Sequence, residues 1–180
     1  MRLQPDFARA HYNLGVALVA TERIPEAIRH YEEALRIQPD FAEAANNLGA
    51  ILCQAGRNAE GIARIEEALR IRPDYARAHF NLGNARAQTG QFPEAIRHFE
   101  EAVRLQPDFA EACNNLGLLL CRIGRIPEGI LQIRAALRAK PDFAPAHFAL
   151  GGALLQSGRA AEVRAAGLSE RAQSRAGCLL

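Results

Sequence analysis

Asparagine recurs with a period of 34 residues, each time directly before a Leu-Gly pair, at Asn13, Asn47, Asn81 and Asn115. A carboxamide carries both a hydrogen-bond donor and an acceptor, which complement the paired groups of an extended polypeptide backbone. Asparagine within a helix costs roughly 0.5 kcal/mol relative to alanine, so its repetition needs a reason. The column predicts either recognition of a peptide main chain or hydrogen bonds between neighbouring helices.

Other polar and aromatic residues recur beside these asparagines. The position just before them holds Tyr12, Asn46, Phe80, Asn114 and Phe148. The position four residues before them holds Arg9, Glu43, Arg77 and Glu111, and Asn84 follows Asn81 by three residues. The alternatives are packing of the aromatic rings between adjacent helices and ion pairing of the Arg/Glu positions between repeats. The residues that we expect to contact a peptide are Arg9, Tyr12, Asn13, Asn46, Asn47, Arg77, Phe80, Asn81, Asn84, Asn114 and Asn115.

Histidines and cysteines are spaced too widely for a metal centre. His11, His79 and His147 are 68 residues apart, and His30 and His98 form a second set with the same spacing. Ligands that far apart cannot share one metal, so we expect packing or capping histidines. The four cysteines, which we expect to be buried and reduced, are Cys53, Cys113, Cys121 and Cys178. No enzymatic activity, cofactor or metal is therefore predicted.

Composition narrows the class of partner. The net charge of +2 favours neither a nucleic-acid groove nor an anionic membrane surface. No apolar run reaches the roughly 20 residues that span a bilayer, and no apolar stretch follows the first charged residue. The prediction is a cytoplasmic protein with no nucleic-acid or membrane partner.

The segment Asp40–Gly49 defines the elements that must position these residues. It recurs at Asp6, Asp74, Asp108 and Asp142, and a fixed period of this size indicates stacked repeats. In each repeat a proline ends the preceding helix and the aspartate is the expected N-cap of a first helix. That helix is predicted to end at a left-handed glycine, namely Gly56, Gly90, Gly124 or Gly158.

A second helix is predicted to follow each of these turns. Pro25, Pro93 and Pro127 are expected at its first position. The first repeat has Glu22 where the others have glycine, so we expect a looser turn there. The glycine after each leucine of the first helix predicts a close approach of the two helices. Repeats one and three resemble each other, as do two and four, so large residues in one are expected to face smaller residues in the next.

The repeated unit resembles the tetratricopeptide repeat in three features. These are Leu-Gly in the first helix, an alanine, aromatic and alanine series in the second helix (Ala27, Tyr31 and Ala34), and the closing proline. The resemblance implies an all-α, right-handed superhelical solenoid of antiparallel helix pairs whose first helices line the concave face. Similar asparagine ladders occur in the repeats of O-linked N-acetylglucosamine transferases, which hold substrate polypeptide. The expected divisions are the end of a preceding repeat (1–5), repeats at 6–39, 40–73, 74–107 and 108–141, a partial or capping repeat (142–176) and a tail (177–180).

The resemblance predicts a protein–protein interaction scaffold that binds an extended polypeptide in a concave groove. A clamp for two carboxylates is disfavoured because Lys140, the sole lysine, lies at a helix end. Two alternatives stay open. In the first, the chain is the substrate-recruiting region of a larger enzyme such as a glycosyltransferase. In the second, it is a structural array that forms homo-oligomers through uncapped ends.

Overall fold

The computed structural model describes residues 5–158, in which every regular element is an α-helix. The all-α prediction is therefore confirmed for this range. No helix within it is long and apolar enough to cross a lipid bilayer. The helices are α1 (Pro5–Ala20), α2 (Ile24–Ile37), α3 (Ala42–Gln54), α4 (Asn58–Ile71), α5 (Ala76–Gln88), α6 (Phe92–Leu105), α7 (Ala110–Arg122), α8 (Ile126–Ala139) and α9 (Ala144–Gln156).

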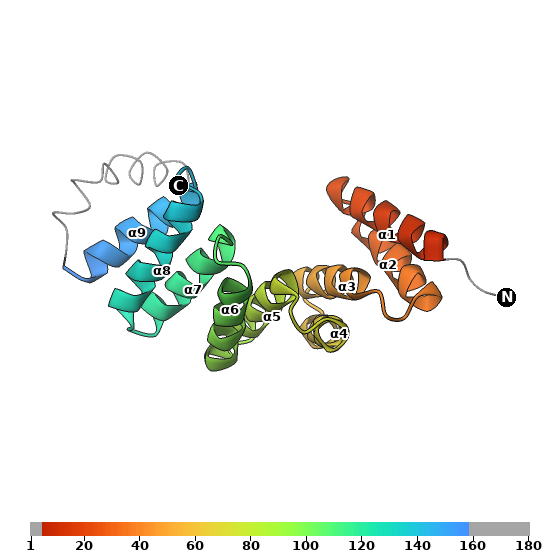
Figure 1. The fold of residues 1–180 in the computed structure, drawn as a ribbon, viewed down its shortest axis with the longest axis horizontal. Coiled ribbons are helices and arrows are strands. Elements are labelled where there is room, and N and C mark those ends of the chain that lie inside the picture. Colours follow the sequence, from red (N-terminus) through yellow and green to blue (C-terminus); the bar gives the residue numbers. More distant parts are fainter. Residues whose placement is uncertain (1–4, 159–180) are drawn as a thin grey trace. The chain divides into compact units, whose positions relative to one another are not determined.

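The chain divides into two compact units, Met1–His98 and Phe99–Leu180, with the division inside α6. In the first unit, α1 packs on α2 and α3 packs on α4, while α2 contacts α3 and α4 contacts α5. In the second unit, α7, α8 and α9 lie side by side (Figure 1). First helices of successive repeats also touch, as α3 does α5 and α7 does α9. These contacts are what place the repeated asparagines near one another.

Glycines in the first helices allow the expected close approach of helix pairs. A Cβ atom on Gly49 would lie 2.6 Å from the carbonyl oxygen of Gly61, and one on Gly117 would lie 2.7 Å from that of Gly129. In the first repeat the Gly15 position faces the ring of Tyr31, which is 1% exposed. Either an aromatic ring or the backbone of the second helix therefore fills the space that the glycine leaves. These contacts lie within single repeats, so the expectation that large residues in one repeat face smaller residues in the next stays a prediction.

The predicted aspartate N-caps are wrong for four of the first helices. The N-cap residues of α3, α5, α7 and α9 are aromatic, and none has a side-chain capping hydrogen bond; they are Phe41, Tyr75, Phe109 and Phe143. Asp40 lies one residue earlier, in a turn closed by the Phe41 amide, which donates to the Gln38 carbonyl oxygen. Burial of the aromatic ring fixes this register, since Phe41 is only 5% exposed. In α1 the acid Asp6 lies within the first turn.

The predicted left-handed turns are present after α3, α5, α7 and α9. Gly56, Gly90, Gly124 and Gly158 have φ between +74° and +86°. The expected looser turn at Glu22 is wrong, because Glu22 takes the same conformation with φ +59°. Pro25 and Pro127 lie in the first turn, one residue after the helix begins at Ile24 and Ile126, rather than at the first position.

Three cysteines lie in the described range, and all are buried and free. Burial raises the pKa of the thiols of Cys53, Cys113 and Cys121, which keeps them protonated and unreactive. The expectations for residues 1–4, for the part of the partial or capping repeat (142–176) that follows residue 158, for the tail at 177–180 and for Cys178 lie outside the described residues.

Candidate functional site

A chain of hydrogen-bonded carboxamides connects three first helices in the first unit. Asn81 Nδ2 on α5 donates to Asn46 Oδ1 on α3 at 2.9 Å. Asn46 Nδ2 donates to Asn47 Oδ1 at 3.1 Å, and Asn47 Nδ2 donates to Tyr12 Oη on α1 at 3.3 Å. We call Asn81, Asn46, Asn47 and Tyr12 the amide relay. The alternative of hydrogen bonds between neighbouring helices is thus present for these residues.

Exposure separates the asparagines into two groups. Asn46 is fully buried and Asn114 is 3% exposed, so neither side chain reaches a ligand directly. Both are placed to orient the asparagine that follows them, because Asn114 Nδ2 donates to Asn115 Oδ1 at 3.3 Å as Asn46 does to Asn47. The partly or fully exposed asparagines are Asn13, Asn47, Asn81, Asn84 and Asn115. The proposal for direct contact is therefore restricted to this second group.

The aromatic and arginine candidates pack against each other. The ring centroid of Tyr12 lies 5.0 Å from that of Phe41, so Tyr12 packs between successive first helices. The Arg9 guanidinium carbon lies 5.6 Å from the Phe41 ring centroid, and that of Arg77 lies 5.7 Å from the Phe80 ring centroid. Both arginines are exposed. Each ring therefore supports a cation at the surface by a cation–π contact.

The alternating acids are held differently from these arginines. Glu43 pairs with Arg72, at 3.1 Å, and Arg72 stacks on the Tyr75 ring with 3.7 Å to its centroid. Arg72 is the C-cap residue of α4, so this ion pair joins α3 to the end of its own partner helix. Glu43 therefore forms an ion pair within its own repeat. The expected ion pairing between repeats, with Arg9 or Arg77, is not what holds this acid.

The amide pattern changes in the second unit. Asn114 Oδ1, the equivalent of the acceptor Asn46 Oδ1, is buried and has no hydrogen-bond partner among the described residues. The donor in the first unit is Asn81, whose position two repeats later holds Ala149. The loss of one asparagine therefore interrupts the relay at α9.

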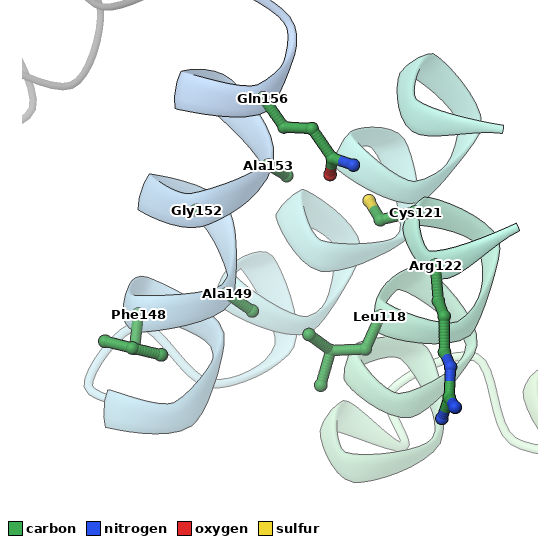
Figure 2. Close-up of a pocket in the computed structure, with 8 residues that line it drawn as sticks. All are labelled: Leu118, Cys121, Arg122, Phe148, Ala149, Gly152, Ala153 and Gln156. Carbon is green, nitrogen blue, oxygen red and sulfur yellow. The ribbon is translucent and has the colours of Figure 1, made fainter. Parts of the chain in front are cut away.

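A cavity of about 400 Å³ lies between α7 and α9, where the asparagine is lost. Figure 2 shows the Leu118 side chain on α7 pointing toward α9 and the Gln156 side chain on α9 pointing toward α7, whereas the Arg122 side chain runs alongside α7. The described residues that line it are Leu118, Cys121, Arg122, Phe148, Ala149, Gly152, Ala153 and Gln156. Sequence reasoning missed this cavity. The available signals were alanine in place of asparagine at Ala149 and the double glycine Gly151-Gly152.

The two sets of histidines, which appear unrelated in the sequence, pair with each other. His11 on α1 and His30 on α2 have their Nδ1 atoms 2.9 Å apart, and those of His79 on α5 and His98 on α6 are 3.2 Å apart. His79 Nε2 lies 3.0 Å from the Pro73 carbonyl oxygen, to which it donates. Burial, and then the facing His79, lower the pKa of His98 from 6.5 to about 4.

Each histidine pair is a hydrogen bond between the two helices of one repeat. Ring centroids 5.1 Å apart, with Nδ1 atoms 2.9 Å apart, place the His11 and His30 rings head-on, with one proton between the two nitrogen atoms. Within residues 5–158 no group of three or more His, Cys, Asp or Glu residues could hold a metal ion.

Family models for the tetratricopeptide repeat match residues 8–41, residues 40–108, and residues 80–142 together with 114–176. The chain belongs to the tetratricopeptide repeat family, and its fold is an all-α solenoid of such repeats. No curated protein matches the chain.

Several solved structures have the same fold at low sequence identity. A crystal structure of MamA is 22% identical, covers 98% of both chains and has a TM-score of 0.77. The 41-end part of MamA from Desulfovibrio magneticus RS-1 is 21% identical, covers 97% of both chains and has a TM-score of 0.78. YrrB, described as a TPR protein with an unusual peptide-binding site, is 22% identical, covers 83% of this chain and 77% of its own, and has a TM-score of 0.67. At these identities the likeness shows the fold alone.

Proposed function

We propose that this chain is a protein–protein interaction scaffold that binds extended polypeptide along its first helices. The observation that carries the proposal is the two-layer arrangement of the asparagines. A buried carboxamide, Asn46 or Asn114, donates to a more exposed one, Asn47 or Asn115, at the next position of the same helix. The exposed amides are thereby held in one orientation before any ligand arrives, which lowers the entropy cost of binding.

The exposed amides retain capacity for a peptide backbone. A carboxamide has two N–H donors and two acceptor lone pairs. Asn47 uses one N–H on Tyr12 and accepts one bond from Asn46. A peptide that runs across α3 would therefore find a donor and an acceptor on the same side chain, matching its own N–H and C=O groups. Arg9 and Arg77, each over an aromatic ring, would add contacts to acidic or polar groups of the ligand.

Relatives by fold support this use of the surface. The description of YrrB gives that protein a peptide-binding site. The asparagine column itself resembles the ladder by which repeats of O-linked N-acetylglucosamine transferases hold polypeptide. Together with the relay, these similarities favour recognition of main-chain groups over recognition of one particular side chain.

The test removes the exposed amides and measures peptide binding. Peptides selected from a displayed random library on the full chain are titrated against wild type and against a triple variant, Asn47→Ala, Asn81→Ala and Asn115→Ala. Because each amide contributes about 1 kcal/mol of hydrogen bonding, the triple variant should bind at least tenfold more weakly. The control is Glu32→Ala with Arg70→Ala, which alters exposed positions of the second helices α2 and α4. Equal affinity of the triple variant and wild type would refute the proposal.

A further inference from the structure

Gly152 lies within α9, and packing against the described residues does not explain it. A Cβ atom on Gly15, Gly49 or Gly117 would come closer than 3.0 Å to the facing helix. A Cβ atom on Gly152 would meet no heavy atom of residues 5–158 within 4 Å. Glycine in a helix interior destabilises the helix relative to alanine, so this position sacrifices stability without a gain in packing. What the missing side chain leaves is open space.

That open space belongs to the cavity between α7 and α9. The wall opposite Gly152 is Leu118, which is 46% exposed, and the outer edge is Phe148, which is 69% exposed. The base consists of small side chains, Ala149 and Ala153, with Cys121. At the position of Gly152 the two preceding repeats carry larger residues, Asn84 and Leu118. Small residues at positions 149 and 152 of α9 therefore keep the cavity open.

We propose that this cavity binds one large apolar side chain of the polypeptide ligand, and that Arg122 binds an acidic residue next to it. This inference rests on the proposed function, because the occupant is part of the same bound polypeptide. The cavity adjoins the asparagine column, since Asn115 lies one helical turn before Leu118 on α7. A backbone held at Asn115 therefore directs a nearby side chain toward the cavity.

The expected preference of the cavity for an apolar side chain of the ligand follows from its lining. Six of its eight described lining residues are apolar or glycine, and apolar pockets with a few polar groups at the edge are the usual form of a ligand site. A leucine or phenylalanine of the ligand would remove Leu118 and Phe148 from water together with itself. Polar side chains would lose hydration there without a partner on the cavity wall.

The expected preference for an acidic ligand residue next to the apolar one follows from charge complementarity. Among the described lining residues, Arg122 is the charged one and Gln156 is the other polar one. A guanidinium group binds a carboxylate with two parallel hydrogen bonds, which gives it both strength and direction. The ligand class is therefore a peptide with a large apolar residue beside Asp or Glu.

The test fills the cavity with a leucine side chain placed at position 152. Random nonapeptides displayed on phage are selected on the full wild-type chain, and the enriched sequences should contain Leu, Ile, Phe or Met beside Asp or Glu. The best of these, made synthetically, should bind at least tenfold more weakly to Gly152→Leu. Since a Cβ atom at position 152 meets no heavy atom of the described residues within 4 Å, and leucine favours a helix over glycine, this variant should melt no lower than wild type, which shows that the fold is intact.

Two matched variants make the test specific. Ala50→Leu adds the same side chain at the equivalent position of α3 and should change the affinity less than twofold. Arg122→Gln should remove the preference for Asp or Glu over Asn or Gln in the peptide while the preference for the apolar residue remains.

The contradicting results separate the two proposals. Peptides that need Asn47, Asn81 and Asn115 but bind Gly152→Leu as tightly as wild type would overturn the cavity assignment alone. Failure to enrich any sequence on the wild-type chain would overturn the proposed function and this inference together. If the wild-type chain forms a dimer and Gly152→Leu dissociates it, the cavity would be assigned to a second copy of the chain. If Gly152→Leu binds peptide more tightly than wild type, the cavity would be assigned to residues 159–180. Either result overturns the inference.

Discussion

A single backbone position distinguishes the first repeat from the others. Glu22 has φ +59°, where the equivalent residues are glycines with the same left-handed conformation. The Arg23 amide donates to the Leu18 carbonyl oxygen at 2.9 Å, as the Arg57 amide does to that of Leu52. The hydrogen bonds of the turn are therefore kept, and the strain falls on the backbone of Glu22 alone.

Replacing this glutamate should stabilise the protein. A left-handed conformation costs a non-glycine residue about 1–2 kcal/mol. Replacing that residue with glycine removes this cost, but part of the gain is offset because glycine loses more conformational entropy on folding. Glu22→Gly should therefore raise the free energy of unfolding by about 1 kcal/mol, measured by urea denaturation. The reciprocal change, Gly56→Glu, should lower it by a similar amount, because a Cβ atom there meets nothing within 4 Å and only the backbone conformation matters. A neutral effect of both changes would contradict this explanation.

His98 predicts a pH dependence of stability. It faces His79 and Arg86 from α5, Arg97 from α6 and Glu66 from α4, and its pKa is lowered from 6.5 to about 4. As pH falls below 6.5 the unfolded chain takes up the proton first, so stability is intact above pH 6.5 and decreases until about pH 4. Each pKa unit corresponds to about 1.4 kcal/mol, which would give about 3.5 kcal/mol between 6.5 and about 4. Because solvent screens the half-buried ring, we expect a smaller loss, on the order of 2–3 kcal/mol.

The measurement compares variants across this range. The free energy of unfolding of wild type and His98→Gln is followed from pH 7.5 to pH 4. The variant should lose less stability than wild type over this range. Parallel curves for wild type and His98→Gln would show that the depressed pKa is not the cause.

At the scale of helices, the repeated asparagines act as cross-links between elements. The bond from Asn81 to Asn46 joins α5 to α3, and the bond from Asn47 to Tyr12 joins α3 to α1. Between α7 and α9 the equivalent donor is absent, and Asn114 Oδ1 is buried without a partner among the described residues. An unpaired buried acceptor is destabilising, so α9 is held less firmly on α7 than α5 is on α3.

Restoring the donor should strengthen this contact. Ala149→Asn places a carboxamide at the position of Asn81 and should raise the free energy of unfolding by about 1 kcal/mol. The control is the same substitution in an Asn114→Ala background, where the gain should vanish because the acceptor is gone. An equal gain in both backgrounds would mean that the new side chain acts by some contact other than this hydrogen bond. Urea denaturation of the four proteins measures the coupling.

At the scale of the whole molecule, each unit is an array in which successive repeats pack on one another, as α3 does on α5 and α7 does on α9. The described part of the first unit contains its own buried clusters, such as the one around Tyr31, Leu48 and Ile51. The second unit has another, which includes Cys113, Ile133 and Leu154. In such arrays stability is approximately a sum of local terms, so damage to one repeat spreads only weakly.

Hydrogen exchange should reveal this local character. Gly49→Ala places a Cβ atom 2.6 Å from the Gly61 carbonyl oxygen and should separate α3 from α4. We expect amide exchange in α3 and α4 to accelerate more than tenfold while that in α7, α8 and α9 changes less than threefold. Gly117→Ala is the matched variant and should reverse the pattern. Uniform acceleration across both units would show instead that the chain unfolds as one cooperative body.

Most of the fold could be predicted because its determinants are local. The 34-residue period, the left-handed glycines and the leucine-glycine pairs depend on residues close in sequence, and each is confirmed by the helices, turns and close approaches of the structure. The aspartate N-cap prediction failed because burial of Phe41, and of Phe109 at the equivalent position of α7, outweighed the local preference for a capping side chain.

The candidate site could be predicted only as a column of positions. Sequence determined that carboxamides recur in register and that the fifth repeat lacks one. Tertiary structure alone decided that Asn46 is buried while Asn47 is partly exposed, that His79 meets His98, and that Gly152 opens a cavity. The reason is physical: period and helix type are fixed along the chain, whereas exposure and pairing depend on which residues of another helix fill the space opposite.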